Sequence, residues 1–400
     1  MNPRHGASWV GCAALALSLI APSALADAAP PKPRARDLGV PFTGTPGRWN
    51  AITDVPGVEV GTVTLVKGKG ALKRGEGPVR TGVTAILPRG KQAPQDPVFA
   101  GWFALNGNGE MTGTTWIDES GLLWGPVMIT NTQSVGVVRD AVIGWSLARY
   151  QVDLDDNWAL PVVAETWDGW LNDINGFHVK PEHAYAALDD AHGGAVAEGN
   201  VGGGTGMICY EFKGGTGSAS RLVTVAGSEF VVAALVQANF GLRRQLMVAG
   251  VPVGQELADF PSAGALLRPN NGNDVGSIIV VLATNAPLLP HQLKRIARRA
   301  AMGVARTGGT ASNSSGDIFV AFSTANSGAG SPDGIASLKM LANEHMTPLF
   351  QAAAEATEEA IINALVAADT MTGVNDHRAE ALPHDQLVAL LKKYHRLAQH

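Results

Sequence analysis

The distribution of hydrophobic and polar positions along the chain predicts strands and helices that interleave. Short apolar runs bounded by glycine or polar turn residues predict strands at residues 57–65, 97–105, 122–130, 160–165, 206–212, 222–226, 230–236, 245–253, 277–283 and 317–323. The closely spaced runs between residues 206 and 253 indicate antiparallel pairing. The runs at 277–283 and 317–323 are almost continuously apolar, which is typical of strands buried on both faces.

Helical periodicity predicts four helices, at residues 135–150, 290–306, 343–368 and 385–398. In the second of them, Pro290 stands in the first turn, and the side chains on one face are apolar: Leu293, Ile296 and Ala300. The other face carries four cations, which we interpret as a solvated face rather than an anion site: Lys294, Arg295, Arg298 and Arg299. The long helix 343–368 is expected to pack on a sheet. Without a fixed-period repeat or an internal linker, the pattern predicts a layered α+β body with two sheets covered by helices.

The first 26 residues have the features of a secretory signal peptide. Arg4 provides the positive start, residues 10–20 form a short apolar run, and the small residues around Ala26 fit a cleavage site. The run is too short to span a bilayer comfortably, so an uncleaved anchor is the weaker alternative. We therefore expect a periplasmic or secreted protein, with residues 27–50 as a loose N-terminal lead.

The composition narrows the class of protein further. The chain has 400 residues, of which 46% are hydrophobic and 16% charged, which suffices for a large core and excludes disorder. Removal of residues 1–26 leaves 29 basic against 35 acidic residues, a net charge of −6 that disfavours nucleic acid or an anionic membrane as partner. It also leaves Cys209 as the remaining cysteine, which rules out an internal disulfide; its apolar neighbours predict a buried thiol rather than a nucleophile.

Several common catalytic and cofactor motifs are missing. The chain contains no Walker A motif, no dinucleotide fingerprint in the glycine-rich stretch 199–206, no zinc-binding spacing of histidine and cysteine, and no Gly-x-Ser-x-Gly elbow. Metal hydrolases and the familiar Ser-His-Asp enzymes are therefore poorly supported, and we expect no metal and no cofactor.

Two polar clusters stand directly before the two most apolar strands. One runs from Asn273 through Gly276 to Ser277, and the other contains Ser315 and Asp317. From the pattern alone, two ordinary polar turns would account for both. The sharper interpretation is a self-cleaving precursor, because a glycine before the serine permits strained backbone and leaves the carbonyl of Gly276 unshielded.

Self-cleavage would give Ser277 its own proton acceptor. Attack of the Ser277 hydroxyl on the Gly276 carbonyl, followed by hydrolysis of the ester, would leave Ser277 with a free α-amine. The ordinary pKa of an α-amine is about 7.7–8.0, so the amine can serve as general base for the hydroxyl of the same residue without a histidine. A second Gly-Ser bond, Gly217–Ser218, is followed by polar residues, and we interpret it as a flexible hairpin tip.

The chain resembles the self-processing aminopeptidase family that includes L-aminopeptidase/D-esterase-amidase and the β-peptidyl aminopeptidases. The resemblance covers roughly residues 45–380 and rests on several blocks that occur in the same order: 130–141, 165–169, 202–210, 236–241, 276–288 and 315–317. It implies a four-layer αββα sandwich, similar in layout to the N-terminal nucleophile hydrolases but with different strand connectivity.

The resemblance also implies roles for individual residues. The chain would be cut between Gly276 and Ser277 into an α piece, 27–276, and a β piece, 277–400, which form one αββα domain. Ser277 would be the nucleophile, and Ser315 and Asp317 would hydrogen-bond it and tune its amine. Asn239 would donate to the oxyanion, and two further residues would contact the substrate, Glu165 at its amino end and Trp167 as an apolar wall.

Two positions depart from the pattern of some relatives, because Asp317 is Glu and Trp167 is Tyr in those proteins. The substrates implied are short peptides, amino-acid amides or esters, and the enzyme would be a homo-oligomer of αβ units that needs no membrane after the signal is removed. Two alternatives stay open: an ornithine-acetyltransferase-like acyl transferase, which typically uses Thr, and a non-catalytic periplasmic binding protein.

Overall fold

The computed structural model describes residues 32–93, 96–150, 158–262, 276–331 and 334–398. The chain divides into two compact units, Met1–Lys32 and Pro33–His400. All the helices and strands described below belong to the second unit. The predicted signal segment 1–26 lies outside the described residues, and so does the stretch 263–275 that leads to Gly276.

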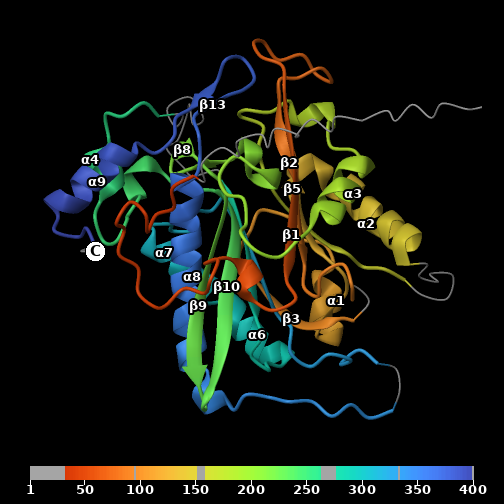
Figure 1. Ribbon diagram of the computed structural model, residues 1–400. Coiled ribbons are helices and arrows are strands. Elements are labelled where there is room, and N and C mark those ends of the chain that lie inside the picture. The colour runs from red at the N-terminus through yellow and green to blue at the C-terminus, as the bar shows by residue number, and fades with distance from the viewer. Residues whose placement is uncertain (1–31, 94–95, 151–157, 263–275, 332–333, 399–400) are drawn as a thin grey trace, which may run out of the picture. The chain divides into compact units, whose positions relative to one another are not determined.

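The second unit contains two main sheets and the helices that cover them (Figure 1). The strands are β1 (Glu59–Lys67), β2 (Val79–Leu87), β3 (Val98–Gly107), β4 (Leu122–Leu123), β5 (Val127–Asn131), β6 (Val162–Thr166), β7 (Ile208–Cys209), β8 (Phe212–Lys213), β9 (Gly215–Val225), β10 (Ser228–Asn239), β11 (Ser277–Thr284), β12 (Gly316–Ser323), β13 (Met371–Thr372) and β14 (Arg378–Ala379). The α-helices are α1 (Thr114–Ser120), α2 (Val135–Tyr150), α3 (Pro181–Asp190), α4 (Val253–Glu256), α6 (Pro290–Ala297), α7 (Ala300–Arg306), α8 (Thr347–Val366) and α9 (His384–Lys393).

The two main sheets have different strand orders. The smaller sheet has the order β1-β2-β5-β6, and the larger has the order β4-β3-β12-β11-β10-β9. Neighbouring strands are antiparallel except for the pairs β5/β6 and β11/β12. Because β11 and β12 are parallel, both begin at the same edge of the larger sheet, and the antiparallel β10 ends there.

Three apolar clusters separate four layers. The cluster between the sheets takes alternate residues of β11, namely Ile279, Val281 and Ala283, and residues of β2, β5 and β6. The remaining apolar residues of β11, Ile278, Val280 and Leu282, lie in a second cluster with α6, α7 and α8, while a third cluster joins the smaller sheet to α2 and α3. Figure 1 shows α8 running along β9 and β10, the strands it contacts. This arrangement confirms the predicted αββα sandwich, and it explains why β11 is apolar on both faces.

The N-terminal lead is ordered where it is described, which corrects the expectation of a loose segment. Ala35 is fully buried, and Arg36 makes a bidentate ion pair with Glu359 of α8, with both N–O distances at 2.8 Å. Glu359 also pairs with the buried Arg221 at 2.7 Å. Buried charges require such partners, and here the partners attach the segment after Lys32 to the C-terminal part of the chain.

The Gly217–Ser218 bond is not a hairpin tip. Both residues lie inside β9, and Ser218 is fully buried with its hydroxyl donating to the carbonyl of Ala234 at 2.7 Å. A Cβ at position 217 would lie 2.1 Å from the carbonyl oxygen of Ala360, so glycine there permits the close packing of α8 on the sheet. The polar sequence reflects this contact rather than a flexible turn.

Other boundaries also differ from the prediction. Helix 290–306 is divided at Arg298–Arg299 into α6 and α7. Residues 245–253 comprise the last residue of a 3₁₀ turn (Arg243–Gln245), a loop and the first residue of α4 instead of a strand. Residues 206–212 contribute two-residue strands after a 3₁₀ turn, whereas α2 has the predicted bounds. Cys209 is fully buried, as expected. None of the helices in the described part of the chain is long and apolar enough to cross a membrane.

Candidate active site

Ser277 is the first residue of β11, a central strand, and lies between residues of the two neighbouring strands at one end of the larger sheet. Its register partners are Asn239, the last residue of β10, and Gly316, the first residue of β12. Its hydroxyl accepts a hydrogen bond from the backbone N–H of Gly316 at 3.2 Å, and the residue is 7% exposed. By strand alternation its side chain lies on the same face as Ile279, which is the face toward the smaller sheet.

Gly276 occupies a position that has no room for a side chain. A Cβ there would lie 2.1 Å from the carbonyl oxygen of Asn239 and 2.5 Å from the Cα of Phe240. Both obstacles are backbone atoms at the end of β10 and directly after it, so they cannot yield as a flexible side chain would. Glycine at position 276 is therefore required by packing as well as by the proposed chemistry.

The side chain of Asn239 is held by two backbone groups. Its Oδ1 accepts from the N–H of Ile208 at 2.8 Å, which fixes the orientation of the amide, and its Nδ2 donates to the carbonyl of Trp167 at 3.0 Å. An amide nitrogen carries two hydrogens, so one donor remains for a further acceptor. Asn239 is 6% exposed and is adjacent to Ser277, the position expected of an oxyanion donor.

Ser315 and Asp317 form a hydrogen-bonded pair, in which the serine hydroxyl donates to Oδ1 of the carboxylate at 2.7 Å. Both are 1% exposed, and they flank Gly316, the register partner of Ser277. Alternation along β12 places the Asp317 side chain on the helix-covered face, opposite the Ser277 hydroxyl, and the Ser315 hydroxyl bonds to it there. The backbone nitrogen of Ser277 lies in the plane of the sheet between the two faces. Ser277, Ser315 and Asp317 thus lie at the same end of the larger sheet. The hydroxyl of Ser277 is on one face of the sheet, and the Ser315–Asp317 pair is on the other.

Glu165 is buried at the end of β6, at 4% exposure. The Thr132 hydroxyl donates to its Oε2, and the N–H of Glu110 donates to its Oε1 at 3.0 Å. Burial raises the pKa of the Glu165 carboxyl above its ordinary value, against the two hydrogen bonds, which lower it. No local pattern in the sequence marks Thr132 as part of the site, although it lies in one of the blocks that carry the family resemblance.

Gly109 separates the Glu165 carboxylate from the strand edge that carries Ser277. A Cβ at position 109 would lie 3.2 Å from Oε1 of Glu165 and 3.2 Å from the Cα of Gly316. Gly316 is in turn the direct neighbour of Ser277. The Glu165 carboxylate and the predicted nucleophile Ser277 therefore lie close enough for one small substrate to reach both, a relationship between distant residues that the sequence does not reveal.

Trp167 combines a fixed backbone with an exposed side chain. Its carbonyl accepts the Asn239 hydrogen bond, while its indole is 41% exposed. A Cβ on Gly169 would come within 2.5 Å of the indole ring, so the glycine lets the ring fold against the following turn. The side chain predicted as an aromatic wall thus lies at the surface, and its own carbonyl contacts the predicted oxyanion donor Asn239.

Asp168 is a buried carboxylate that sequence analysis did not identify. It is 1% exposed, and its Oδ1 accepts from Nδ2 of Asn172 at 3.0 Å. Burial raises the pKa of Asp168 to about 7. Its position directly after Trp167 makes it part of the turn that presents the carbonyl to Asn239.

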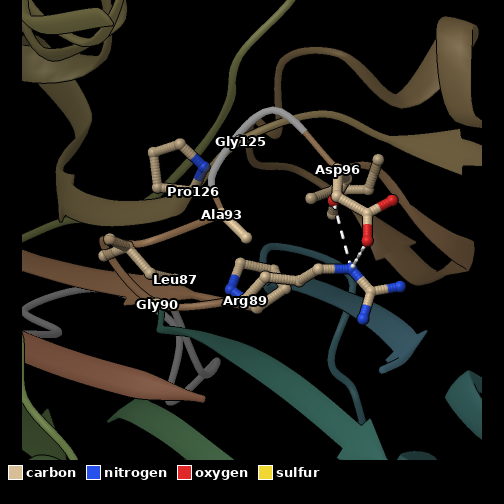
Figure 2. A pocket seen from close by; sticks show the side chains of 9 residues that line it. Leu87, Arg89, Gly90, Ala93, Asp96, Gly125 and Pro126 are labelled. Atoms are coloured by element: carbon tan, nitrogen blue, oxygen red, sulfur yellow. Dashed lines mark hydrogen bonds and ion pairs between the residues drawn. The ribbon is translucent and has the colours of Figure 1, made fainter. Parts of the chain in front are cut away.

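A surface pocket lies where β2 ends and β5 begins, at the end of the smaller sheet opposite the one that carries Glu165 (Figure 2). Its charged residues, Arg89 and Asp96, pair with each other at 2.9 Å. Arg89 also donates to the carbonyl of Thr324 at 2.7 Å, and Asp96 accepts from the N–H of Gly328 at 2.8 Å. These hydrogen bonds hold the segment that follows β12. Both charged side chains therefore have structural partners, and the pocket is not a candidate catalytic site.

The described residues contain no group of three or more histidine, cysteine or acidic side chains that would hold a metal ion. What the site does contain is a serine hydroxyl at the start of a strand, an amide donor beside it, and a buried carboxylate within a short reach. This set suits acyl transfer from a substrate that carries a positive charge next to its carbonyl group.

Comparisons with known proteins agree with this chemistry. The model of peptidase family S58 matches residues 50–379. The beta-peptidyl aminopeptidase BapA of Sphingosinicella microcystinivorans is 60% identical over 390 residues, which cover 95% of this chain and 98% of the relative. The protein of the same name from Sphingosinicella xenopeptidilytica is 48% identical over 391 residues, which cover 96% and 97% of the two chains.

Solved structures show the same fold. The L-aminopeptidase D-Ala-esterase/amidase of Ochrobactrum anthropi superposes with a TM-score of 0.86 at 49% identity, covering 92% of this chain and all of that one. That structure is described as a prototype for the serine aminopeptidases and a new variant among the Ntn hydrolase fold. A beta-aminopeptidase of Burkholderia sp. gives a TM-score of 0.82 at 49% identity, covering 92% and 99%.

Proposed function

The chain belongs to peptidase family S58 and is an aminopeptidase, and from this premise we propose that it cuts itself between Gly276 and Ser277 and then works with Ser277 as an N-terminal nucleophile. The observation that carries the proposal is the position of Ser277, at the start of a buried strand, beside an amide donor and after a glycine that packing requires. Family membership favours a hydrolase over the acyltransferase and binding-protein alternatives.

Self-cleavage proceeds in two steps. The hydroxyl oxygen of Ser277 attacks the carbonyl carbon of Gly276, the bond from that carbon to the nitrogen of Ser277 breaks, and the hydroxyl proton ends on the departing amine. Water then hydrolyses the resulting ester, which gives Gly276 a carboxylate and returns the hydroxyl to Ser277. The products are the pieces 27–276 and 277–400.

The working reaction uses the same atoms on a peptide. The free amine of Ser277, paired with Ser315 and Asp317, takes the proton of the hydroxyl as the oxygen attacks the first carbonyl of the substrate. The second N–H of Asn239 stabilises the oxyanion, a contribution of about 2.7–4 kcal/mol where comparable donors have been removed. The leaving amine receives the proton, and water releases the acyl group from Ser277.

Glu165 explains why the reaction begins at a free N-terminus. As a carboxylate it pairs with the ammonium group of the substrate, and it lies across Gly109 from Gly316, the neighbour of Ser277 on β12. The two curated relatives are named as beta-peptidyl aminopeptidases. We therefore propose short peptides and amides with a free N-terminal β-amino acid as substrates, with α-amino acids and esters as further ones and Trp167 as an apolar wall beside them.

The proposal includes export and assembly. Residues 1–26 would direct the chain out of the cytoplasm, to the periplasm or the medium, and the αβ units would form a homo-oligomer. Fractionation of cells with N-terminal sequencing of the larger piece tests the first point, because export predicts a chain that begins at Asp27. Light scattering of the purified protein tests the second, since a mass of one αβ unit would exclude assembly.

Hydrolysis of β-alanyl p-nitroanilide and of its N-acetyl derivative tests the enzymatic proposal. The wild type should release p-nitroaniline from the first compound and leave the second intact, because acetylation removes the charge that Glu165 binds. Ser277→Ala should be inactive on both, whereas the exposed Ser228→Ala serves as control and should match the wild type. Equal rates on the free and the acetylated compound, or an active Ser277→Ala variant, would contradict the proposal.

A further inference from the structure

The two sheets are joined by a polar contact directly beneath the site. Gln237 lies two residues before Asn239 on β10, on the same face of the strand, and is 1% exposed. Its Nε2 donates to the carbonyl of Thr130 on β5 at 3.0 Å and to the hydroxyl of Thr166 on β6 at 2.7 Å. One amide group thus connects the sheet that carries Ser277 to two strands of the other sheet.

Of the two strands that Gln237 contacts, β6 carries Glu165 and β5 pairs with β6 at that residue. Thr130 is the register partner of Glu165 across the β5/β6 pair, and Thr166 follows Glu165 in the sequence. Asn239 makes a similar contact with the carbonyl of Trp167 at the end of the sheets, and deeper between them the layer is an apolar cluster, whose contacts are non-directional. The hydrogen bonds of Gln237 are directional, so they define the spacing of the sheets at this end more narrowly than the apolar packing does.

Packing alone does not account for an amide here. The Oε1 of Gln237 has no hydrogen-bond partner among the residues that the structure describes, and it lies where a Cβ on Gly203 would come within 2.2 Å. Burying a polar atom without a hydrogen-bond partner lowers stability. An apolar side chain of the same length would have no such atom and would avoid this cost. The amide therefore incurs a cost in stability, which a role in positioning the site explains.

We propose that Gln237 is a positioning residue that fixes the distance between Ser277 and Glu165, and thereby the length of the aminoacyl group that the site accepts. The inference rests on the proposed function, in which Ser277 attacks the carbonyl while Glu165 holds the ammonium group. An α- and a β-aminoacyl group differ by one backbone carbon between these two points, which lengthens the path by about 1.3 Å. A displacement of about 1 Å at a reacting centre can change a rate by about 100-fold.

The test compares kcat/KM for β-alanyl p-nitroanilide with kcat/KM for L-alanyl p-nitroanilide. Gln237→Met keeps the length of the side chain and removes both hydrogen bonds, and Thr166→Val removes one of the two acceptors. We expect the ratio of the two kcat/KM values to shift by roughly tenfold in both variants, within the range by which a methylene group is discriminated. Thr166→Ser keeps the hydroxyl and should keep the wild-type ratio.

Gln292→Met provides the matched control. Gln292 is equally buried, and its amide bonds to Leu289, Leu341 and Asn343 far from the site, so its loss affects stability without changing the ratio. A ratio within twofold of wild type in active Gln237→Met and Thr166→Val would overturn the inference. So would failure of both variants to fold when Gln292→Met folds, because Gln237 would then be purely structural. A wild type that hydrolyses neither compound would instead refute the proposed function, and the inference with it.

Discussion

Ser277 and Asn239 are direct cross-strand partners, the first residue of β11 opposite the last residue of β10. The proposed nucleophile and the amide proposed to face the developing charge are therefore positioned by one sheet rather than by loops. Sites built on sheet strands hold their geometry closely, and here the backbone N–H of Gly316 from the third strand contacts the same hydroxyl. This relationship links the fold to the chemistry and leads to the predictions that follow.

Asn239→Asp should lower kcat by about 10²–10³-fold, the loss seen when a single oxyanion donor is removed. Asp still offers an oxygen to the N–H of Ile208 but has no N–H for the oxyanion or for Trp167. Steady-state kinetics of the processed variant provide the measurement, with its urea midpoint as the control for folding. An unchanged kcat would show that Asn239 is no donor, and a collapse in yield would favour a purely structural turn residue.

Glu165→Gln should raise KM for a substrate with a free N-terminus while leaving self-cleavage intact, because the precursor presents no ammonium group at the Gly276–Ser277 bond. The pKa of the Glu165 carboxyl is raised, so in the wild type KM should increase as the pH falls through that pKa and the carboxylate is lost. The variant should lack this limb of the pH profile. Glu119→Gln, an exposed residue of α1, is the control and should behave as wild type; loss of processing in Glu165→Gln would make the carboxylate structural.

Gly276→Ala should prevent normal processing, since its methyl group would lie 2.1 Å from the carbonyl oxygen of Asn239. Gly136→Ala in α2 is the matched comparison, because a Cβ there meets nothing within 4 Å and the helix favours alanine. A denaturing gel of both variants checks the prediction. Cleavage of Gly276→Ala at the wild-type rate would show that the packing around Gly276 is looser than the structure indicates.

Asp168→Asn should flatten the dependence of stability on pH. The pKa of Asp168 rises from 3.8 to about 7 on folding, so between these values the folded chain keeps a proton that the unfolded chain releases. Stability therefore falls as the pH rises across this window, by on the order of 4 kcal/mol at most for this group. Urea unfolding at pH 5 and pH 8, at equal protein concentration, measures the difference. The exposed Asp140→Asn should retain the wild-type slope, and an equal slope in Asp168→Asn would contradict the assignment.

The sequence predicted the two strands that carry the candidate site, β11 and β12, because both are buried on both faces and hence apolar throughout. It did not predict β2, in which Arg80, Thr81, Gly82 and Thr84 interrupt the apolar pattern although all nine residues are buried. Their burial depends on partners distant in the sequence: Arg80 donates to the carbonyl of Thr372 at 2.8 Å, among other contacts. Such polar residues read as a loop until the partners are known.

The residues of the candidate site also divide into those that the local sequence predicts and those that depend on distant partners. Ser277, Ser315, Asp317 and Asn239 lie at strand ends, and the topology brings them to one edge. The contribution of Thr132, Gly109 and Gln237 arises from contacts between segments far apart in the chain, and no local pattern marks them. Likewise, the polar residues at Gly217–Ser218 indicate a turn locally, whereas the packing of α8 makes them part of a strand.

Intact mass under denaturing conditions, combined with N-terminal sequencing, tests the self-cleaving mechanism most directly. The account predicts two pieces that comprise residues 27–276 and 277–400, the smaller beginning with Ser277, and one uncut chain for the Ser277→Ala variant. A mature, active protein that is continuous across Gly276–Ser277, or whose smaller piece begins at Ser218, would contradict it.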